Sequence, residues 1–376
     1  MTDVRREKHR RIISSKTVQV AVLAVICFVI FFPNSSYFDR SANSTGISTN
    51  TDWVQAEIQA EKFQRSEAKQ PTDVEEWCTF VIVCGKGETD AVKEMRALLT
   101  SAMLLTSKPL HFVFLTDDES AKRLETMFDI DLHVSKRPVK VDIWTVPEKS
   151  VETFAATLDY NPRYHHSGIW GTLKLMLPWI LQDVDKAVQV DTDMIFVDDP
   201  ARLWDEFDND DDGESSDWLY KMPLPSMEDP SKICSCVVLF NMARIREANT
   251  YPTLFQQALA TQPKWKVNGI YNTPHGDQGL YWALAKMRNN LVAPLPKRWN
   301  ADRCHDYYDT LKDAALTAPS MLHNNCATGL FKMEFGKAEI YYTFYENYKW
   351  HWLRGDPRKD YDVSVSTHVY EKDGIL

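Results

Sequence analysis

Short apolar runs alternate with amphipathic segments along the middle of the chain. Residues 80–84 and 111–115, which are apolar apart from His111, are typical of buried strands, and residues 90–105 carry apolar side chains at helical spacing between them. The same alternation continues with a helix at 121–128, a strand at 139–144, an amphipathic helix at 169–181 and a strand at 186–190. Strands separated by helices of this length predict a mostly parallel sheet with helices on both faces.

A different pattern is found at the N-terminus, where residues 18–32 are apolar except for Gln19. This run is near the lower limit of what crosses a bilayer of about 30 Å. The basic residues before it predict that the N-terminus stays in the cytosol; they are Arg5, Arg6, Lys8, Arg10, Arg11 and Lys16. We expect a cytoplasmic tail at 1–16 and a signal anchor at 17–33. A cleaved signal peptide is the alternative, but residues 31–33, Phe-Phe-Pro, do not resemble a cleavage site.

Polar residues dominate the next segment, 34–75, and predict a luminal stem. Glycosylation acceptor triplets begin at Asn34 and Asn43, which agrees with a luminal position. A net charge of -10 argues against nucleic acid as the main partner. The remaining chain divides into a luminal domain at 76–356 and a C-terminal tail at 357–376.

Candidate metal ligands follow the strand at 186–190, where the sequence reads Asp191-Thr192-Asp193. Residues two apart on an extended segment point to the same side, and ligands of such sheets bind beyond the carboxyl ends of the strands. Two carboxylates there repel each other unless a cation lies between them, and oxygen ligands suit magnesium or manganese. Such pairs also occur in solvated surface loops, but the buried strand before this pair favours a metal site.

Three further segments carry polar residues at the ends of apolar elements. Gly276-Asp277-Gln278-Gly279 opens an apolar helix at 280–287, Trp299-Asn300 follows a strand-like segment at 290–294, and His323 ends the apolar step 321–323. Taken singly, each has a simpler interpretation: the first is a helix N-cap, and the histidine is an ordinary core residue.

Taken together, the order and spacing of these segments resemble glycosyltransferase family 8, the glycogenin-like retaining transferases. The closest resemblance within that family is to LARGE-type and glucoside xylosyltransferases. It implies a GT-A fold, an α/β architecture with a Rossmann-like mixed sheet flanked by helices, for the domain at 76–356. The resemblance extends over residues 80–356, and the segments that carry it are 80–84, 109–112, 165–175, 190–193, 241–246, 276–278, 299–300 and 322–323.

The resemblance implies a role for each candidate residue. Asp191, Asp193 and His323 would bind one Mn2+ ion, which would hold the diphosphate of a UDP-sugar donor. The residues near the reacting sugar or phosphate would be Asp277, Gln278 and Lys174, although Lys174 on its helix is equally well explained as a solvated charge. The other donor-binding residues would be Cys84, Gly85, Thr192, Ser235, Trp299, Asn300 and Lys332, with Lys337 as the alternative to Lys332.

The sequence departs from the family pattern at Cys234-Ser235-Cys236, where relatives usually have Asn-Ser-Gly. A disulfide between these cysteines would close a small strained ring, so we do not assume one. No second cysteine pair with metal-ligand spacing follows, so they do not predict a zinc site either. Gly279 is typical of glycogenin-like members rather than xylosyltransferases. The donor sugar therefore stays open among xylose, glucose and galactose.

We expect a manganese-dependent retaining transferase of the Golgi membrane, single-pass and type II, with a glycan or glycoprotein acceptor. A clear nucleophilic carboxylate is not evident, so front-face attack is favoured over double displacement. The alternative from another class is a catalytically silent sugar-binding or scaffold protein, motivated by Cys234 and Cys236. A metal phosphatase or nuclease would need further clustered ligands.

Overall fold

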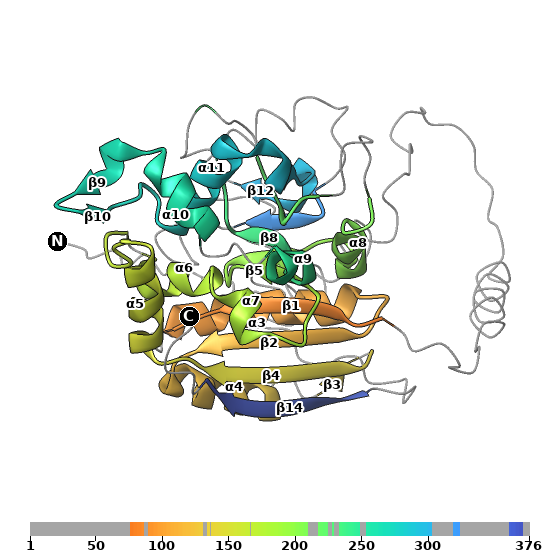
Figure 1. Cartoon of the computed structure of the whole chain (residues 1–376). Coiled ribbons are helices and arrows are strands. Elements are labelled where there is room, and N and C mark those ends of the chain that lie inside the picture. Colours follow the sequence, from red (N-terminus) through yellow and green to blue (C-terminus); the bar gives the residue numbers. More distant parts are fainter. Residues whose placement is uncertain are drawn as a thin grey trace, which may run out of the picture. The chain divides into compact units, whose positions relative to one another are not determined.

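The structure is a computed structural model of the 376-residue chain (Figure 1). It describes residues 76–85, 89–130, 134–135, 137–165, 167–209, 217–224, 228, 233–248, 253–302, 319–323 and 361–370. All of them belong to one compact unit, Glu75–Leu376. The expected cytoplasmic tail, signal anchor and stem lie outside the described residues, as do Lys332 and Lys337. None of the helices in the described ranges has the length and apolar character needed to cross a membrane.

The central sheet has nine strands in the order β11-β7-β8-β5-β1-β2-β4-β14-β3. Strand β8 is antiparallel to both of its neighbours and β3 is antiparallel to β14, while the other five neighbouring pairs are parallel. The sheet is therefore mixed, with a long parallel part. The strand bounds are β1 Cys78–Val83, β2 Leu110–Thr116, β3 Val134–Ser135, β4 Val139–Thr145, β5 Lys186–Val190, β7 Tyr220–Met222, β8 Val237–Asn241, β11 Val292–Pro294 and β14 Tyr361–Val369.

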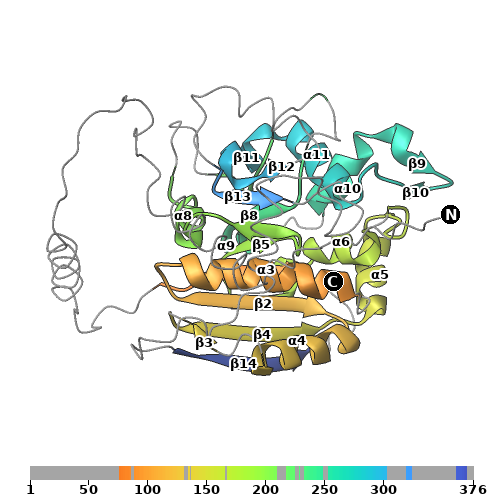
Figure 2. The ribbon, with the colours of Figure 1, turned by 180° about the vertical axis from the view of Figure 1, so that it is seen from behind.

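The central strands are apolar on both faces because each face is covered by helices. Phe80 and Phe112 belong to one buried cluster, whereas their chain neighbours Val81 and Val113 belong to the other. The first cluster includes residues of helices α3 (Thr89–Leu105), α4 (Asp118–Ile130) and α8 (Pro200–Asp205). Helices α3 and α4 lie in front of the sheet in Figure 2.

The second cluster covers the opposite face and is built by shorter helices. They are α5 Glu148–Thr157, α6 Gly168–Lys174, α7 Leu177–Ile180, α9 Met242–Glu247, α10 Thr253–Ala260 and α11 Asp277–Met287. A two-stranded hairpin of β9 (Lys266–Val267) and β10 (Ile270–Tyr271) lies between α10 and α11 in the sequence.

A second, three-stranded sheet brings distant segments to the carboxyl end of β5. Its order is β12 (Ala301–Asp302), β13 (Met321–His323) and β6 (Met194–Phe196). Strand β6 follows β5 after only three residues, and its Met194 is paired with His323 of β13. The pairing therefore holds the histidine next to the acidic segment that separates β5 from β6.

Two elements differ from the sequence-based expectation. The single helix expected at 169–181 is two short helices, α6 and α7, and most of their side chains are buried. Pro178 explains the break, because proline has no N–H to bond to the carbonyl of Lys174, as a continuous helix requires. The expected C-terminal tail contains β14, which pairs with β4 at seven positions and is thus part of the sheet.

Candidate functional site

The two aspartates after β5 lie at the carboxyl edge of the parallel part of the sheet. Val190, the last residue of β5, is aligned with Ile82 near the end of β1. The backbone N–H of Asp191 donates to the carbonyl of Cys236 at 2.8 Å, and Gln189 Nε2 donates to Asp191 Oδ1 at 2.9 Å. The first aspartate is thus fixed through both its backbone and its side chain.

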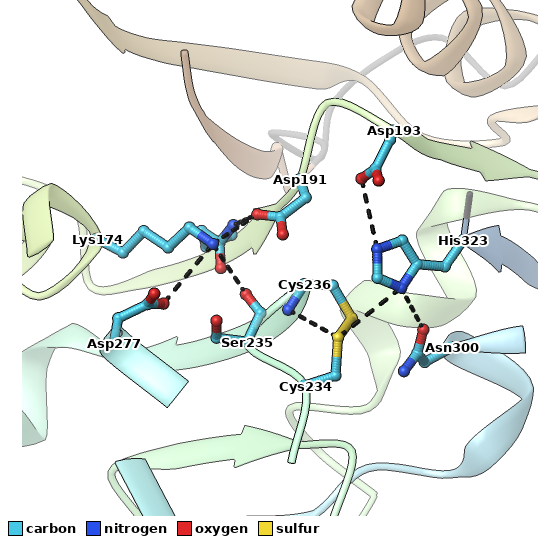
Figure 3. Close-up of a disulfide and its surroundings, with 10 residues drawn as sticks. Lys174, Asp191, Asp193, Cys234, Ser235, Cys236, Asp277, Asn300 and His323 are labelled. Carbon is cyan, nitrogen blue, oxygen red and sulfur yellow. Dashed lines mark hydrogen bonds and ion pairs between the residues drawn. A yellow bond between two sulfur atoms is a disulfide. The ribbon is translucent and has the colours of Figure 1, made fainter. Parts of the chain in front are cut away.

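His323 faces the second aspartate. Its Nε2 lies 3.5 Å from Asp193 Oδ1, and its Nδ1 lies 3.1 Å from Asn300 Oδ1 (Figure 3). The side chains of Asp191, Asp193 and His323 each offer one ligand atom, and these three atoms lie within 4.8 Å of one another. The structure therefore brings together three side chains separated by as much as 132 positions in the sequence.

This donor set fits a divalent cation. An amide oxygen can only accept, so the hydrogen bond with Asn300 places the proton of a neutral imidazole on Nδ1. The lone pair of Nε2 then faces Asp193, which is the arrangement found when a second residue orients a metal-binding histidine. The side chains of Asp191 and Asp193 are 30% and 26% exposed, so the carboxylates are open to solvent while the imidazole is buried.

The charge of Asp193 is maintained by the same histidine. Burial alone would raise the pKa of Asp193, but a protonated His323, through its charge and the hydrogen bond from Nε2, outweighs burial and lowers it. A divalent ion at Nε2 would take the place of that proton and leave the neutral imidazole described above. Two carboxylates and an imidazole held in this way can neutralise a divalent ion through hard oxygen ligands and one nitrogen.

Lys174 lies on the other side of Asp191 and connects it to Asp277. Its Nζ is 2.7 Å from Asp191 Oδ1, 3.7 Å from Asp277 Oδ2 and 3.3 Å from the carbonyl oxygen of Ser235 (Figure 3). Burial by itself lowers the pKa of the ammonium, but attraction to the two carboxylates raises it overall. Lys174 is thus a buried, charged residue of the site, and its interpretation as a solvated charge was wrong.

Asp277 begins α11, directly after Gly276, which has a φ of 62°. This left-handed conformation favours glycine and turns the chain into the helix. Asp277 is buried, and burial raises its pKa even though Lys174 and a hydrogen bond from Ser235 act in the opposite direction. Gln278, the next residue, is half-buried.

Glycines let two elements approach the site closely. A Cβ on Gly171 would lie 2.7 Å from Asp277 Oδ1 and 2.6 Å from Ser167 Oγ, so only glycine fits between them. Gly85, at the end of β1, likewise has no room for a side chain because the ring of Trp170 packs against it. Its neighbour Cys84 is a buried free thiol that donates to Thr116 Oγ1, and burial raises its pKa to about 12.

The structure corrects the expected role of Trp299. This side chain is fully buried in the core and its indole N–H donates to Glu206 Oε1 at 2.9 Å, so it cannot contact a donor. Its position supports Asn300, the partner of His323. Thr192, between the two aspartates, is half-buried and stays a candidate for donor contact.

Cys234 and Cys236 form a disulfide, a bond that we did not assume from the sequence. The turn that contains them brings their Cα atoms to 5.3 Å, which lies within the usual range for disulfides. The short separation in sequence therefore did not exclude the bond. The disulfide packs beside the imidazole, with Cys234 Sγ 3.8 Å from His323 Nδ1.

Sequence reasoning missed Gln189 and Gly171 as parts of the site. Gln189 is fully buried, and its place as a polar residue between Val188 and Val190 is a signal that the sequence did offer. The contact of Gly171 with Asp277 depends on the packing of α6 near α11, which the sequence does not reveal.

Comparison with curated proteins identifies relatives of one named class. The chain is 27% identical over 255 residues to the xylosyl- and glucuronyltransferase LARGE2 of Mus musculus, covering 61% of this chain and 34% of that protein. It is 24% identical over 277 residues to LARGE1 of Mus musculus, covering 68% and 35%. The chain thus spans about a third of the length of these relatives. None of the protein-family models searched matches it.

Comparison with solved structures supports the fold. The galactosyltransferase LgtC, in complex with donor and acceptor sugar analogs, aligns with a TM-score of 0.50 and 13% identity over 74% of this chain and 98% of that chain. The bifunctional glycosyltransferase WbbM aligns with a TM-score of 0.50 and 14% identity over 76% and 52%. The chain has a GT-A-like mixed α/β fold with a central sheet and flanking helices, as predicted.

Proposed function

We propose that this chain is a retaining glycosyltransferase of family 8 that transfers xylose, glucose or galactose from a UDP-sugar to a glycan or glycoprotein acceptor. The observation that carries this proposal is the convergence of Asp191, Asp193 and His323 within 4.8 Å at the carboxyl end of β5. Ligands of open α/β sheets bind at this edge. Similarity to named glycosyltransferases supports the same class of reaction.

The proposed cofactor is Mn2+, held by Asp191, Asp193 and His323. An imidazole among carboxylates favours manganese over magnesium. Such an ion would bind the diphosphate and neutralise charge as the glycosidic bond breaks. Asn300 keeps the imidazole in the tautomer that this role needs, through its 3.1 Å hydrogen bond.

Lys174 supplies a fixed positive charge next to the proposed metal ligands. It is buried, and its two carboxylate partners raise its pKa, so it carries a positive charge at neutral pH. A preorganised cation in a site of low polarity stabilises negative charge that develops on a leaving group. Asp277 orients this ammonium through their ion pair.

Retention of configuration is assigned to front-face attack. Asp277 is paired with Lys174, which weakens it as a nucleophile, and the amide of Gln278 is a poor nucleophile. In the proposed step, an oxygen of the departing diphosphate takes the proton of the acceptor hydroxyl, while that hydroxyl forms the bond to the anomeric carbon. Gln278, half-buried at the start of α11, would contact the donor sugar. A stable covalent glycosyl-enzyme would contradict this step.

The cellular position is part of the same proposal. The basic N-terminal cluster and the apolar run at 18–32 support a single-pass type II protein of the Golgi membrane, with the GT-A-like unit in the lumen. Protease protection of the C-terminal part in sealed microsomes tests this topology.

Donor hydrolysis tests the proposed reaction. The full chain, purified in detergent, should slowly hydrolyse at least one of UDP-xylose, UDP-glucose and UDP-galactose when Mn2+ is present. Asp193→Ala should abolish hydrolysis, while Asp208→Ala, which changes an exposed acid paired with Lys186, should leave it unchanged. Binding of a UDP-sugar by the wild type without turnover of any donor would instead favour a silent sugar-binding protein.

A further inference from the structure

The disulfide between Cys234 and Cys236 lies against the side of His323 that faces away from the aspartates. Cys234 Sγ is 3.8 Å from Nδ1, whereas Asp193 is close to Nε2 (Figure 3). All three side chains are buried, with exposed fractions of 7%, 0% and 5% for Cys234, Cys236 and His323. One imidazole therefore lies between a carboxylate pair and a sulfur pair.

The sulfur side has the dimensions of a metal site. Ligand atoms of Cys234, Cys236 and His323 all lie within 4.8 Å of one another. In a tetrahedral zinc site, ligand atoms lie roughly 3.3–3.8 Å apart, given Zn–S of about 2.3 Å and Zn–N of about 2.0 Å. The observed Sγ to Nδ1 distance of 3.8 Å matches this spacing. Zinc binding would require the two sulfurs to move apart once their bond is broken. The Nδ1 proton, which is hydrogen-bonded to Asn300 Oδ1 at 3.1 Å, would also have to move to Nε2.

We propose that reduction of this disulfide creates a zinc site formed by the Cys234 and Cys236 thiolates and His323 Nδ1. Two equivalents of a small thiol would convert the disulfide to two thiols and would themselves form a disulfide. One phosphine together with one water would do the same, the water supplying two protons to the thiols and its oxygen to the phosphine oxide. Zn2+ would then bind both sulfurs and release two protons. Thiolates are soft ligands, so this site selects zinc over manganese or magnesium.

The third ligand explains why the sequence did not predict a zinc site. A second pair of cysteines at metal-ligand spacing is missing, and His323 is 87 positions after Cys236. The pairing of β13 with β6 is what brings the imidazole to the sulfurs. The fourth position of the zinc ion is left to an exchangeable ligand such as water.

The zinc site and the proposed manganese site exclude each other. A neutral imidazole has one lone pair, which lies on Nδ1 or on Nε2 but not on both. Zinc at Nδ1 leaves the proton on Nε2, which then donates to Asp193 and cannot bind a metal. The exclusion rests on the proposed manganese site, whereas zinc binding itself does not.

Zinc content of the full-length protein tests the site without any activity measurement. The purified protein is incubated with ZnCl2, either oxidised or reduced with a phosphine, then desalted and analysed for metal. Reduction should add one zinc per chain to the wild type. The C234S/C236S variant should gain none, and H323Q should bind at least 10-fold more weakly. Asp193→Asn should still gain one, and Cys78→Ala, at a buried free thiol outside both proposed sites, should behave as the wild type.

Two results would overturn the zinc site: equal zinc uptake by the wild type and C234S/C236S after reduction, or uptake in H323Q as tight as in the wild type. The second result would also reveal unfolding caused by reduction. In an unfolded chain, zinc binding by the thiols would be equally tight with and without His323. Exclusion is tested separately, by titrating Mn2+ into zinc-loaded, reduced protein. Affinity for Mn2+ should fall at least 10-fold in the wild type but not in C234S/C236S, and an unchanged affinity would refute exclusion.

Discussion

The ammonium group of Lys174 lies 2.7 Å from the carboxylate of Asp191, one of the three proposed metal ligands. The same ammonium is 3.7 Å from the buried Asp277, so a single cation balances two acids on different elements. A buried charge that loses its partner is strongly destabilising, whereas an exposed pair contributes little. Loss of Lys174 should therefore cost more stability than loss of an exposed lysine.

Replacing Lys174 should destabilise the fold. Lys174→Met leaves Asp277 buried without its cation, and we expect the free energy of unfolding to fall by about 3–5 kcal/mol. Urea unfolding measures this change. The control is Lys186→Met, because Lys186 is about one-third exposed and pairs with the exposed Asp208, and there we expect less than about 1 kcal/mol. Equal effects of the two substitutions would contradict the central position of Lys174.

Removing the hydrogen-bond acceptor of Asn300 should weaken metal binding. Asn300→Leu keeps the approximate volume but no longer fixes the proton on His323 Nδ1, and we expect affinity for Mn2+ to fall about 10–100-fold. Asn300→Asp keeps an acceptor oxygen and should bind like the wild type or tighter. Titration of Mn2+ in the absence of donor, followed by electron paramagnetic resonance, separates this effect from any contact with the sugar nucleotide.

Adding one methyl group at Gly171 should impair the site. The new Cβ would lie within 2.7 Å of Asp277 Oδ1 and 2.6 Å of Ser167 Oγ, so Asp277 must shift. We expect kcat for donor hydrolysis to fall by about 100-fold, the loss typical of a displacement near 1 Å. The control is Gly269→Ala, where a Cβ meets nothing within 4 Å and only the φ of 87° is strained. That variant should be about 1 kcal/mol less stable and fully active.

Acid should remove a stabilising contribution from Asp142 on β4. Burial alone would raise the pKa of Asp142, but hydrogen bonds from His111, Lys140 and His368 hold it well below its usual range. Because the pKa of Asp142 is lower in the folded chain than in the unfolded chain, its charge stabilises the fold at pH values above the unfolded-state pKa of about 3.9. This stabilisation is lost as the pH falls from that value toward the folded-state pKa.

The difference in unfolding free energy between the wild type and Asp142→Asn should therefore be largest above about pH 5 and shrink below pH 4. Urea unfolding across this range measures it. Asp205→Asn, at a carboxylate that is about half exposed, provides the comparison and should show a small difference at every pH. A wild-type advantage over Asp142→Asn that does not change with pH would contradict the assignment.

The long strands and helices were predictable because their burial leaves a periodic pattern. Phe80 and Val81 face different helical layers, which makes β1 a continuous apolar run. Strands β6, β12 and β13 have only two or three residues, too few for any periodicity to appear, although they build the site. Strand β14 has an alternating pattern, yet its Val365 and Val369 are exposed, so its position is set by backbone pairing with β4 rather than by burial.

The aspartates after β5 could be located from the sequence, because a paired acid at the end of a buried strand is a local signal. The approach of His323 could not be derived from periodicity, since it requires β13 to pair with β6 across more than 120 positions. It was expected only through resemblance to a family. The disulfide and the burial of Trp299 depend on a turn and on packing, neither of which has a signature in the sequence.

The pairing of β14 with β4 has a consequence for synthesis on the ribosome. The two partners, Val139 and Val363, are separated by 224 positions, so β4 has an open hydrogen-bonding edge until the chain has been translated past β14. A nascent chain at this stage exposes a template for association with other chains. We expect ribosome-bound intermediates halted before Tyr361 to be captured by chaperones and to aggregate after release, whereas chains extended past Val369 become protease-resistant.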